Sequence, residues 1–189
     1  MKKIVDHTMI SQKNIVVYSV ALFVLLVLAA FPIYGWLKGI STPSWQYFFL
    51  LMMIVMLLER ISGKYTYELE KKTLVIKKRG LFNSRTLVIN LKNLIGIYDY
   101  QPKLVRAMRF RRTFRMHSAL DARQVWTIAY KVINKKGKEE YWQVYFKPSR
   151  EMLEQLHELY PSKVMVPEEE ALAAALLAER HEGKERKEG

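Results

Sequence analysis

Residues 15–30, IVVYSVALFVLLVLAA, contain no charged side chain and only two polar ones, and this stretch decides the class of the protein. The uncharged region extends from residue 14 to residue 37. A helix of about 20 apolar residues crosses the ~30 Å hydrocarbon core of a bilayer, so the sequence predicts a transmembrane helix. A cleaved signal peptide is the competing interpretation, because Lys2 and Lys3 precede the run. Such peptides, however, have apolar regions of only about 7 to 15 residues.

A second uncharged run, residues 45–58 (WQYFFLLMMIVMLL), follows a short connector that contains Gly39 and Pro43. Ile61 and a snorkelling Arg60 extend this run to about 17 residues, which is enough for a second span. A connector this short allows only a tight turn. The sequence therefore predicts a helical hairpin whose two ends lie on the same side of the membrane.

The net charge of +13 on 189 residues is unevenly distributed along the chain. Residues 60–150 hold 22 Lys and Arg against 6 Asp and Glu, whereas residues 151–189 hold 5 against 10. The hairpin turn carries only Lys38, and Lys and Arg are enriched on the cytoplasmic side of membrane helices. We therefore expect a multi-pass protein of the cytoplasmic membrane with both termini in the cytoplasm. The expected organisation is an N-terminal tail (1–13), the transmembrane hairpin (14–62), a cytoplasmic domain (63–162) and an acidic, partly helical and partly disordered tail (163–189).

From residue 64 onward the apolar period changes to two, which is typical of β-strands. Turn signals at Gly80 and Gly137 separate successive strands. Ser149 then caps an amphipathic helix that ends before Pro161. The expected strands are residues 65–69, 73–77, 85–90, 94–101, 106–117, 125–133 and 140–146.

Residues 106–117, RAMRFRRTFRMH, are assigned to the fifth strand by their period. On a helix the arginine and apolar side chains would interleave around the axis, whereas on a strand they separate onto two faces. Only Arg112 falls on the wrong face. One face carries Met108, Phe110, Phe114 and Met116, and the other carries Arg109, Arg111, Thr113, Arg115 and His117.

Residues 67–97, YELEKKTLVIKKRGLFNSRTLVINLKNLIGI, resemble the bacterial PH-domain membrane proteins that have two transmembrane helices. In those families a strand pair ends in Arg-Gly-Leu-Phe and is followed by an Arg-Thr strand and a Leu-x-x-Ile motif. The resemblance implies a PH-like β-barrel of about seven strands with a C-terminal capping helix, and a binding or scaffold role. The arginine-rich fifth strand, the loop 118–124 and the acidic tail depart from the family's pattern.

The residues that most enzymes and metal sites need are missing or scattered. The chain has no cysteine, and its eight glycines form no phosphate-binding loop. Its four histidines lack the spacing of metal ligands. We therefore expect no enzymatic activity, no metal and no cofactor. In a membrane enzyme, which is the alternative, Glu59 and Arg60 would be the only polar candidates, and they are more simply an ion pair at the helix end.

The remaining feature is a basic surface held near a membrane. Each Lys or Arg near an anionic leaflet adds about 1 kcal/mol, so three or four would hold the domain against the bilayer. The expected partners are the bilayer with its anionic headgroups or an acidic membrane protein, and a homo-oligomer is left open. Nucleic acid is not expected, because aromatic stacking platforms are missing. The alternative is a purely structural subunit of a membrane complex. The expected anion-contacting residues are Arg109, Arg111 and Arg115 of the fifth strand, with Lys77, Lys78, Arg79 and Arg85.

The acidic tail begins at Pro167 with three glutamates, which is a typical helix start. Leu172, Leu176 and Leu177 form a thin apolar stripe, so a solvated helix and a docking helix both fit the pattern. A tail that folds back onto the basic domain would compete with anionic lipid for the same arginines. We expect such electrostatic autoinhibition.

Overall fold

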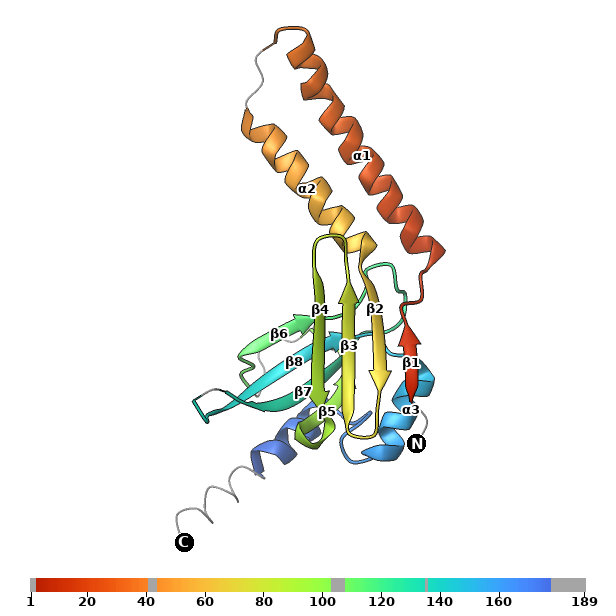
Figure 1. Ribbon diagram of the computed structural model, residues 1–189, viewed down its shortest axis with the longest axis vertical. Helices are drawn as coiled ribbons and strands as arrows, with labels where there is room; N and C mark the ends of the chain where they lie inside the picture. The colour runs from red at the N-terminus through yellow and green to blue at the C-terminus, as the bar shows by residue number, and fades with distance from the viewer. Residues whose placement is uncertain (1–2, 41–43, 103–107, 135, 178–189) are drawn as a thin grey trace.

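The structure is a computed structural model that describes residues 3–40, 44–102, 108–134 and 136–177. A helical hairpin projects from one end of a domain built mainly of β-strands (Figure 1). The two helices of the hairpin are α1 (Gln12–Leu37) and α2 (Ser44–Ser62). Both are long and apolar enough to cross a membrane, and neither is buried against the rest of the protein. The Tyr47 hydroxyl donates a hydrogen bond to the Pro32 carbonyl at 2.6 Å, which ties the two helices together.

The strands form two four-stranded sheets. The first sheet is an antiparallel meander of β1 (Ile4–His7), β2 (Lys64–Leu69), β3 (Thr73–Arg79) and β4 (Ser84–Asn90). A short 3-10 helix, η1 (Leu91–Asn93), leads into the second sheet. Its strands, in spatial order, are β5 (Leu94–Asp99), β7 (Trp126–Ile133), β8 (Glu139–Phe146) and β6 (Arg112–Arg115).

The expected closed barrel is not formed by the described residues, because no strand of the first sheet pairs with a strand of the second. Where β4 faces β6, side chains make the contact: the Arg85 guanidinium lies over the Phe114 ring, 4.3 Å from its centroid. The strands of the second sheet run across those of the first (Figure 1). The two sheets therefore enclose the core between their faces without hydrogen-bonding into one ring.

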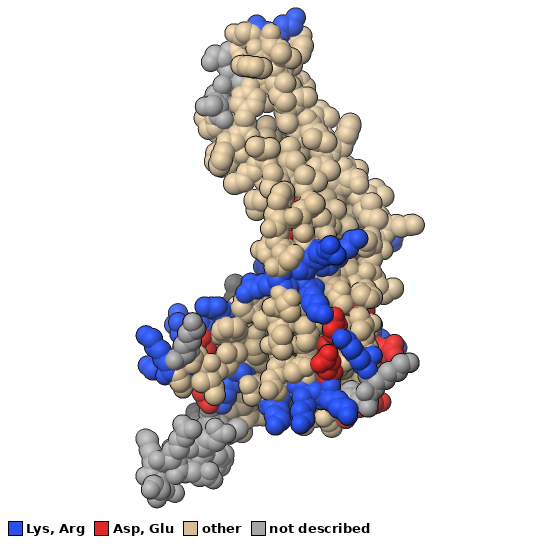
Figure 2. Space-filling view, viewed as in Figure 1, with Lys and Arg blue, Asp and Glu red and all other residues tan. Residues whose placement is uncertain are grey.

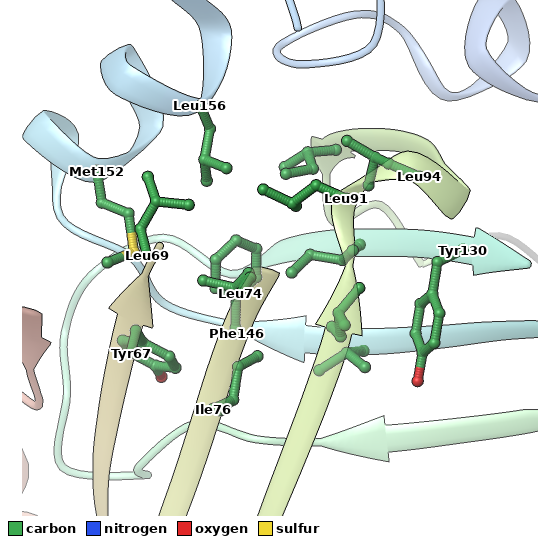
Figure 3. Close-up of a cluster of buried hydrophobic side chains, with 14 of the residues drawn as sticks. Tyr67, Leu69, Leu74, Ile76, Leu91, Leu94, Tyr130, Phe146, Met152 and Leu156 are labelled. Carbon is green, nitrogen blue, oxygen red and sulfur yellow. The ribbon is translucent and has the colours of Figure 1, made fainter. Parts of the chain in front are cut away.

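The main core lies between the two sheets and is covered at one end by helix α3 (Arg150–Leu159). Met152 and Leu156 of α3 point toward Leu69 and Leu74 of the first sheet (Figure 3). Ser149 caps this helix by accepting a hydrogen bond from the backbone N–H of Met152 at 3.3 Å. The predicted C-terminal capping helix is thus confirmed.

Strand β1 lies inside the segment that the sequence predicts to be a tail. It pairs with β2 from Ile4 opposite Leu69 to His7 opposite Thr66. Because β1 precedes α1 and β2 follows α2, both ends of the hairpin are fixed to adjacent strands of one sheet. Four residues of alternating burial are too short to stand out as a strand in the sequence.

The predicted fifth strand is shorter than expected. Only Arg112–Arg115 form β6, which runs parallel to β8, and residues 103–107 lie outside the described residues. The predicted apolar face nevertheless turns inward, since Met108 and Met116 are buried and Phe110 and Phe114 are partly buried. Met116 and Phe114 join the main core, whereas Met108 and Phe110 join a second cluster. The chain therefore leaves one core and enters another within this segment.

Residues 168–177 form a helix whose first turn docks on the second sheet. Ala171 and Leu172 are buried against Ile95 and Tyr98 of β5. Gly96 allows this approach, because a Cβ atom there would lie 2.6 Å from the Cβ of Ala171. Of the two open interpretations of this helix, docking is the one observed. Residues 178–189 lie outside the described residues, and the expected autoinhibition stays a prediction.

Candidate anion-binding site

A cavity of about 520 Å³ lies where the end of α2 meets the sheet domain. Both the helix and the sheet domain contribute apolar and charged side chains to its lining. Four lining residues come from the last turns of α2, and the others come from β2, β3, the β3–β4 turn, β6 and the loop after β6. The lining residues are Val55, Met56, Glu59, Arg60, Tyr65, Lys78, Phe82, Arg115, His117 and Ala119.

Glu59 anchors the end of α2 to the first sheet. Its carboxylate accepts hydrogen bonds from the Lys78 ammonium group at 2.7 Å and from the backbone N–H of Phe82 at 3.0 Å. Gly80 leaves room for this contact, since a Cβ there would lie 2.5 Å from a carboxylate oxygen of Glu59. Glu59 therefore forms its ion pair with Lys78 and not, as expected, with Arg60.

Lys78 reaches this position because of its place in β3. Leu74, Ile76 and Lys78 alternate along the strand and share its inner face, and the first two are buried in the core. The inner face therefore ends in a cation at the point where the strand reaches the hairpin. Lys77, on the opposite face, pairs with Glu68 instead.

Arg60 and Arg115 supply two further positive charges to the cavity. Both side chains are exposed, and neither forms an ion pair with any residue that the structure describes. They act on a common neighbour, His117, whose pKa is lowered from 6.5 mainly by burial and further by the charges of Lys147, Arg115 and Arg60. The cavity is thus an electropositive site with two arginines that lack an anionic partner in the described chain.

The loop that carries His117 and Ala119 is held against the start of α1. The backbone N–H of Ser11 donates to the Leu120 carbonyl at 2.9 Å, and the Asn14 side chain donates to the Ala119 carbonyl at 3.2 Å. The cavity is therefore bounded by a loop that is anchored to the first helix and by strands that are anchored to the second.

A buried charged cluster fixes the same loop from the side of the domain. Arg123 bridges Asp121, at 2.7 Å, and Asp6 of β1, at 2.9 Å. Burial alone would raise the pKa of Asp121, but the hydrogen bonds and charge of Arg123 outweigh it and lower that pKa. The ammonium group of Lys147 donates to the Asp121 carbonyl, and burial lowers its pKa. These contacts fix the loop beside the cavity.

The β3–β4 turn places apolar side chains next to the cavity. Leu81 and Phe82 are neighbours in the sequence and are 61% and 71% exposed, so the turn presents an apolar surface beside the cavity. The turn lies alongside α2 at the end of the domain from which the hairpin projects (Figure 1). Lys and Arg side chains gather at the same boundary, where the apolar hairpin joins the sheets (Figure 2).

The structure brings only two of the seven sequence-predicted residues, Lys78 and Arg115, into this cavity. Arg79 lies at the same end of the sheet, opposite Lys64 of β2. The others have separate surroundings, since Arg85 stacks on Phe114 and Lys77 pairs with Glu68.

Arg109 and Arg111 lie before β6 rather than on one strand face with Arg115. They line a separate hollow with Phe110, and Arg111 forms an ion pair with Glu140 at 2.8 Å. The three arginines therefore do not share one described strand, and of the three only Arg115 lines this cavity. The predicted anion contact of Arg109 and Arg111 stays a prediction.

Eight of the ten described lining residues are absent from the predicted set, among them Arg60, Phe82 and His117. The sequence signals were present: an arginine directly after an apolar helix and an apolar pair within a basic turn. Their convergence depends on the pairing of β2 with β3 and on the anchoring of the 118–121 loop, which no local pattern reveals.

Among the described residues, no three His, Asp or Glu side chains are grouped closely enough to hold a metal ion. No protein-family model, curated protein or solved structure matches the chain.

Proposed function

We propose that this chain is a membrane-anchored, non-enzymatic binding protein whose basic domain contacts the anionic headgroups of the bilayer that holds its hairpin. One observation carries the proposal: the cations Arg60, Lys78 and Arg115 surround a cavity at the end of an apolar helix long enough to cross a membrane. Both ends of the hairpin would then be cytoplasmic, in keeping with the single described lysine, Lys38, at its tip.

In the proposed orientation only the basic residues near the junction between the helical hairpin and the sheets contact the membrane. Lys64 and Arg79 pair at the hairpin end of β2 and β3, near the cavity cations. Lys71 and Lys72 lie in the turn at the other end of these strands, which is about 20 Å away at ~3.4 Å per residue. Each cation near an anionic leaflet contributes about 1 kcal/mol, so the cavity cations together with Lys64 and Arg79 are sufficient to hold the domain at the membrane.

The apolar β3–β4 turn supports the same orientation. Leu81 and Phe82 are exposed and are flanked by Arg79 and Arg85. In the proposed orientation the two apolar side chains enter the interfacial region of the bilayer, and Arg79 meets the phosphates.

We further propose that the domain is related to the bacterial PH-domain membrane proteins that residues 67–97 resemble. The order of strands β2–β8 followed by α3 supports this relation. The parallel β6 and the additional strand β1 are departures that this chain would have acquired.

The proposal is tested with the full chain reconstituted into zwitterionic bilayers that contain trace spin-labelled lipids. The expected result is that phosphatidic acid and phosphatidylglycerol probes are motionally restricted at the protein more than phosphatidylcholine, and that salt reduces the difference. Equal restriction of all three probes at low salt would contradict the proposal. The full chain is needed, because β1 precedes α1 and completes the sheet.

A further inference from the structure

We propose that the cavity at the end of α2 binds the phosphomonoester headgroup of one membrane lipid, with the lipid chains lying along Val55 and Met56. The inference rests on the proposed function and makes it specific, since it replaces a general attraction to anionic lipid by one site with a preferred headgroup.

The charges of the cavity match a dianion. Of the described lining residues, Arg60, Lys78 and Arg115 are cationic and Glu59 is anionic, which leaves a balance of two positive charges while His117 is neutral. A phosphomonoester carries a charge of about −1.5 to −2 at neutral pH, whereas a phosphodiester such as phosphatidylglycerol carries about −1. The monoester therefore neutralises the cavity more completely.

The two arginines have the chemistry that a phosphate needs. Guanidinium groups bind phosphate oxygens through paired hydrogen bonds, and neither Arg60 nor Arg115 has an ion-pair partner among the described residues. Lys78 is already held by Glu59 at 2.7 Å, so it contributes charge from a fixed position. Binding would also favour protonation of His117, which faces the same group of cations.

The helix separates the polar and apolar parts of the cavity along the membrane normal. Met56 and Arg60 are four residues apart on α2 and lie on one face, with Met56 about 6 Å nearer the hairpin tip. A lipid with its phosphate at Arg60 would therefore direct its chains past Met56 toward the hydrocarbon core. Free phosphate could not use this apolar wall.

The size of the cavity also favours a lipid over a small ion. A volume of about 520 Å³ lies within the ~300–1,000 Å³ range of small-molecule sites. It accommodates a phosphate together with the glycerol unit and the first chain carbons.

The test is calorimetric titration of the full chain in a non-ionic detergent at about 0.15 M salt. The ligands are dioctanoyl phosphatidic acid, dioctanoyl phosphatidylglycerol, dioctanoyl phosphatidylcholine and glycerol 3-phosphate. We expect one site that binds phosphatidic acid about tenfold tighter than phosphatidylglycerol, because one additional charge is neutralised. Glycerol 3-phosphate should bind much more weakly, because it lacks the chains.

Three variants and a control locate the site. Arg60→Gln and Arg115→Gln should each weaken phosphatidic acid binding at least about tenfold. Met56→Trp should weaken binding of the lipid but not of glycerol 3-phosphate. Arg150→Gln, which changes an exposed side chain of α3 outside the cavity, is the matched control and should change nothing. Thermal unfolding checks that each variant is folded.

The outcomes separate the inference from the proposed function. Equal affinity for the two anionic lipids, or full affinity in both arginine variants, would overturn the inference while anionic lipid binding as such stands. Affinity for phosphatidylcholine equal to that for both anionic lipids would overturn the inference and the proposed function together. Tight binding of glycerol 3-phosphate would replace the lipid by a soluble phosphate ester.

Discussion

The Glu59 carboxylate lies 2.7 Å from the Lys78 ammonium group, which joins the last turn of an apolar helix to the inner face of a strand. The same carboxylate accepts a hydrogen bond from the backbone N–H of Phe82 at 3.0 Å, which adds the β3–β4 turn to this junction. The pair also sets the charge of the cavity, because Glu59 is its single described carboxylate.

The first prediction concerns the Glu59→Gln variant. The glutamine can still accept the hydrogen bond from Phe82, but one negative charge leaves the cavity. We expect about threefold tighter binding of anionic lipid, the effect of a unit charge at several ångströms in a hydrated site. Titration with dioctanoyl phosphatidic acid measures it. Loss of a cellular activity in this variant, at normal abundance and insertion, would instead support a membrane enzyme that uses Glu59.

The second prediction concerns the docked helix 168–177. In Gly96→Ala the new methyl group would meet Ala171, so the helix must shift and the variant should lose about 1–3 kcal/mol of stability. Faster amide hydrogen exchange across 168–177 is the local signature. The double variant Gly96→Ala, Ala171→Gly removes the steric conflict and should recover part of the loss. No recovery would show that the contact does not limit docking.

The helical hairpin, the inward faces of the strands and α3 follow from local patterns in the sequence. Uncharged runs define the helices, and Leu74 and Ile76 turn inward as their alternation predicts. Sheet closure does not follow from such patterns, because it depends on which edge strands pair. The Arg85 side chain of β4 stacks on Phe114 of β6 between the two sheets, and in the sequence each looks like an ordinary strand residue.

The third prediction concerns the anchoring of β1. Asp6 accepts hydrogen bonds from Arg123 at 2.9 Å and from the backbone N–H of Ser149 at 2.6 Å. Asp6→Asn weakens both hydrogen bonds and leaves Asp121 as the only carboxylate beside the half-buried Arg123 among the described residues. We therefore expect the free energy of unfolding to fall by about 1–3 kcal/mol. Denaturant unfolding and hydrogen exchange of β1 measure it. Val5→Thr, on the exposed face of the same strand, is the control and should stay within about 0.5 kcal/mol of the parent.

The sequence predicts the anion-binding character of the site but not the set of residues that forms it. The sequence indicates an anion-binding surface near a membrane, and Lys78 and Arg115 belong to the predicted set. Arg60 is placed by the direct connection of α2 to β2, whereas His117 is placed by long-range hydrogen bonds of the following loop to Ser11 and Asn14. Contacts across more than 100 residues leave no periodic signal in either segment.

The fourth prediction concerns the protonation of His117. Burial and the nearby charges of Lys147, Arg115 and Arg60 lower its pKa in the folded protein, so it should titrate below its usual 6.5. At a pH between the lowered pKa of the folded protein and the ordinary pKa of the unfolded chain, His117 is protonated in the unfolded chain and neutral in the folded one. The free energy of unfolding should therefore fall as the pH is lowered from about 7 through the folded pKa, and become independent of this group below it.

NMR titration of the His117 ring, assigned by its loss in His117→Gln, measures the folded pKa directly. The same variant should flatten the fall in stability below pH 7, whereas His7→Gln, a histidine of β1 outside the cavity, should leave it in place. A dianion in the cavity offsets the charges of Arg60 and Arg115, so saturation with dioctanoyl phosphatidic acid should raise the pKa of His117 toward or above its usual value. A ring that titrates at 6.5 or higher without ligand would contradict this arrangement of charges around His117. A pKa that stays unchanged on saturation would place the lipid phosphate elsewhere on the domain.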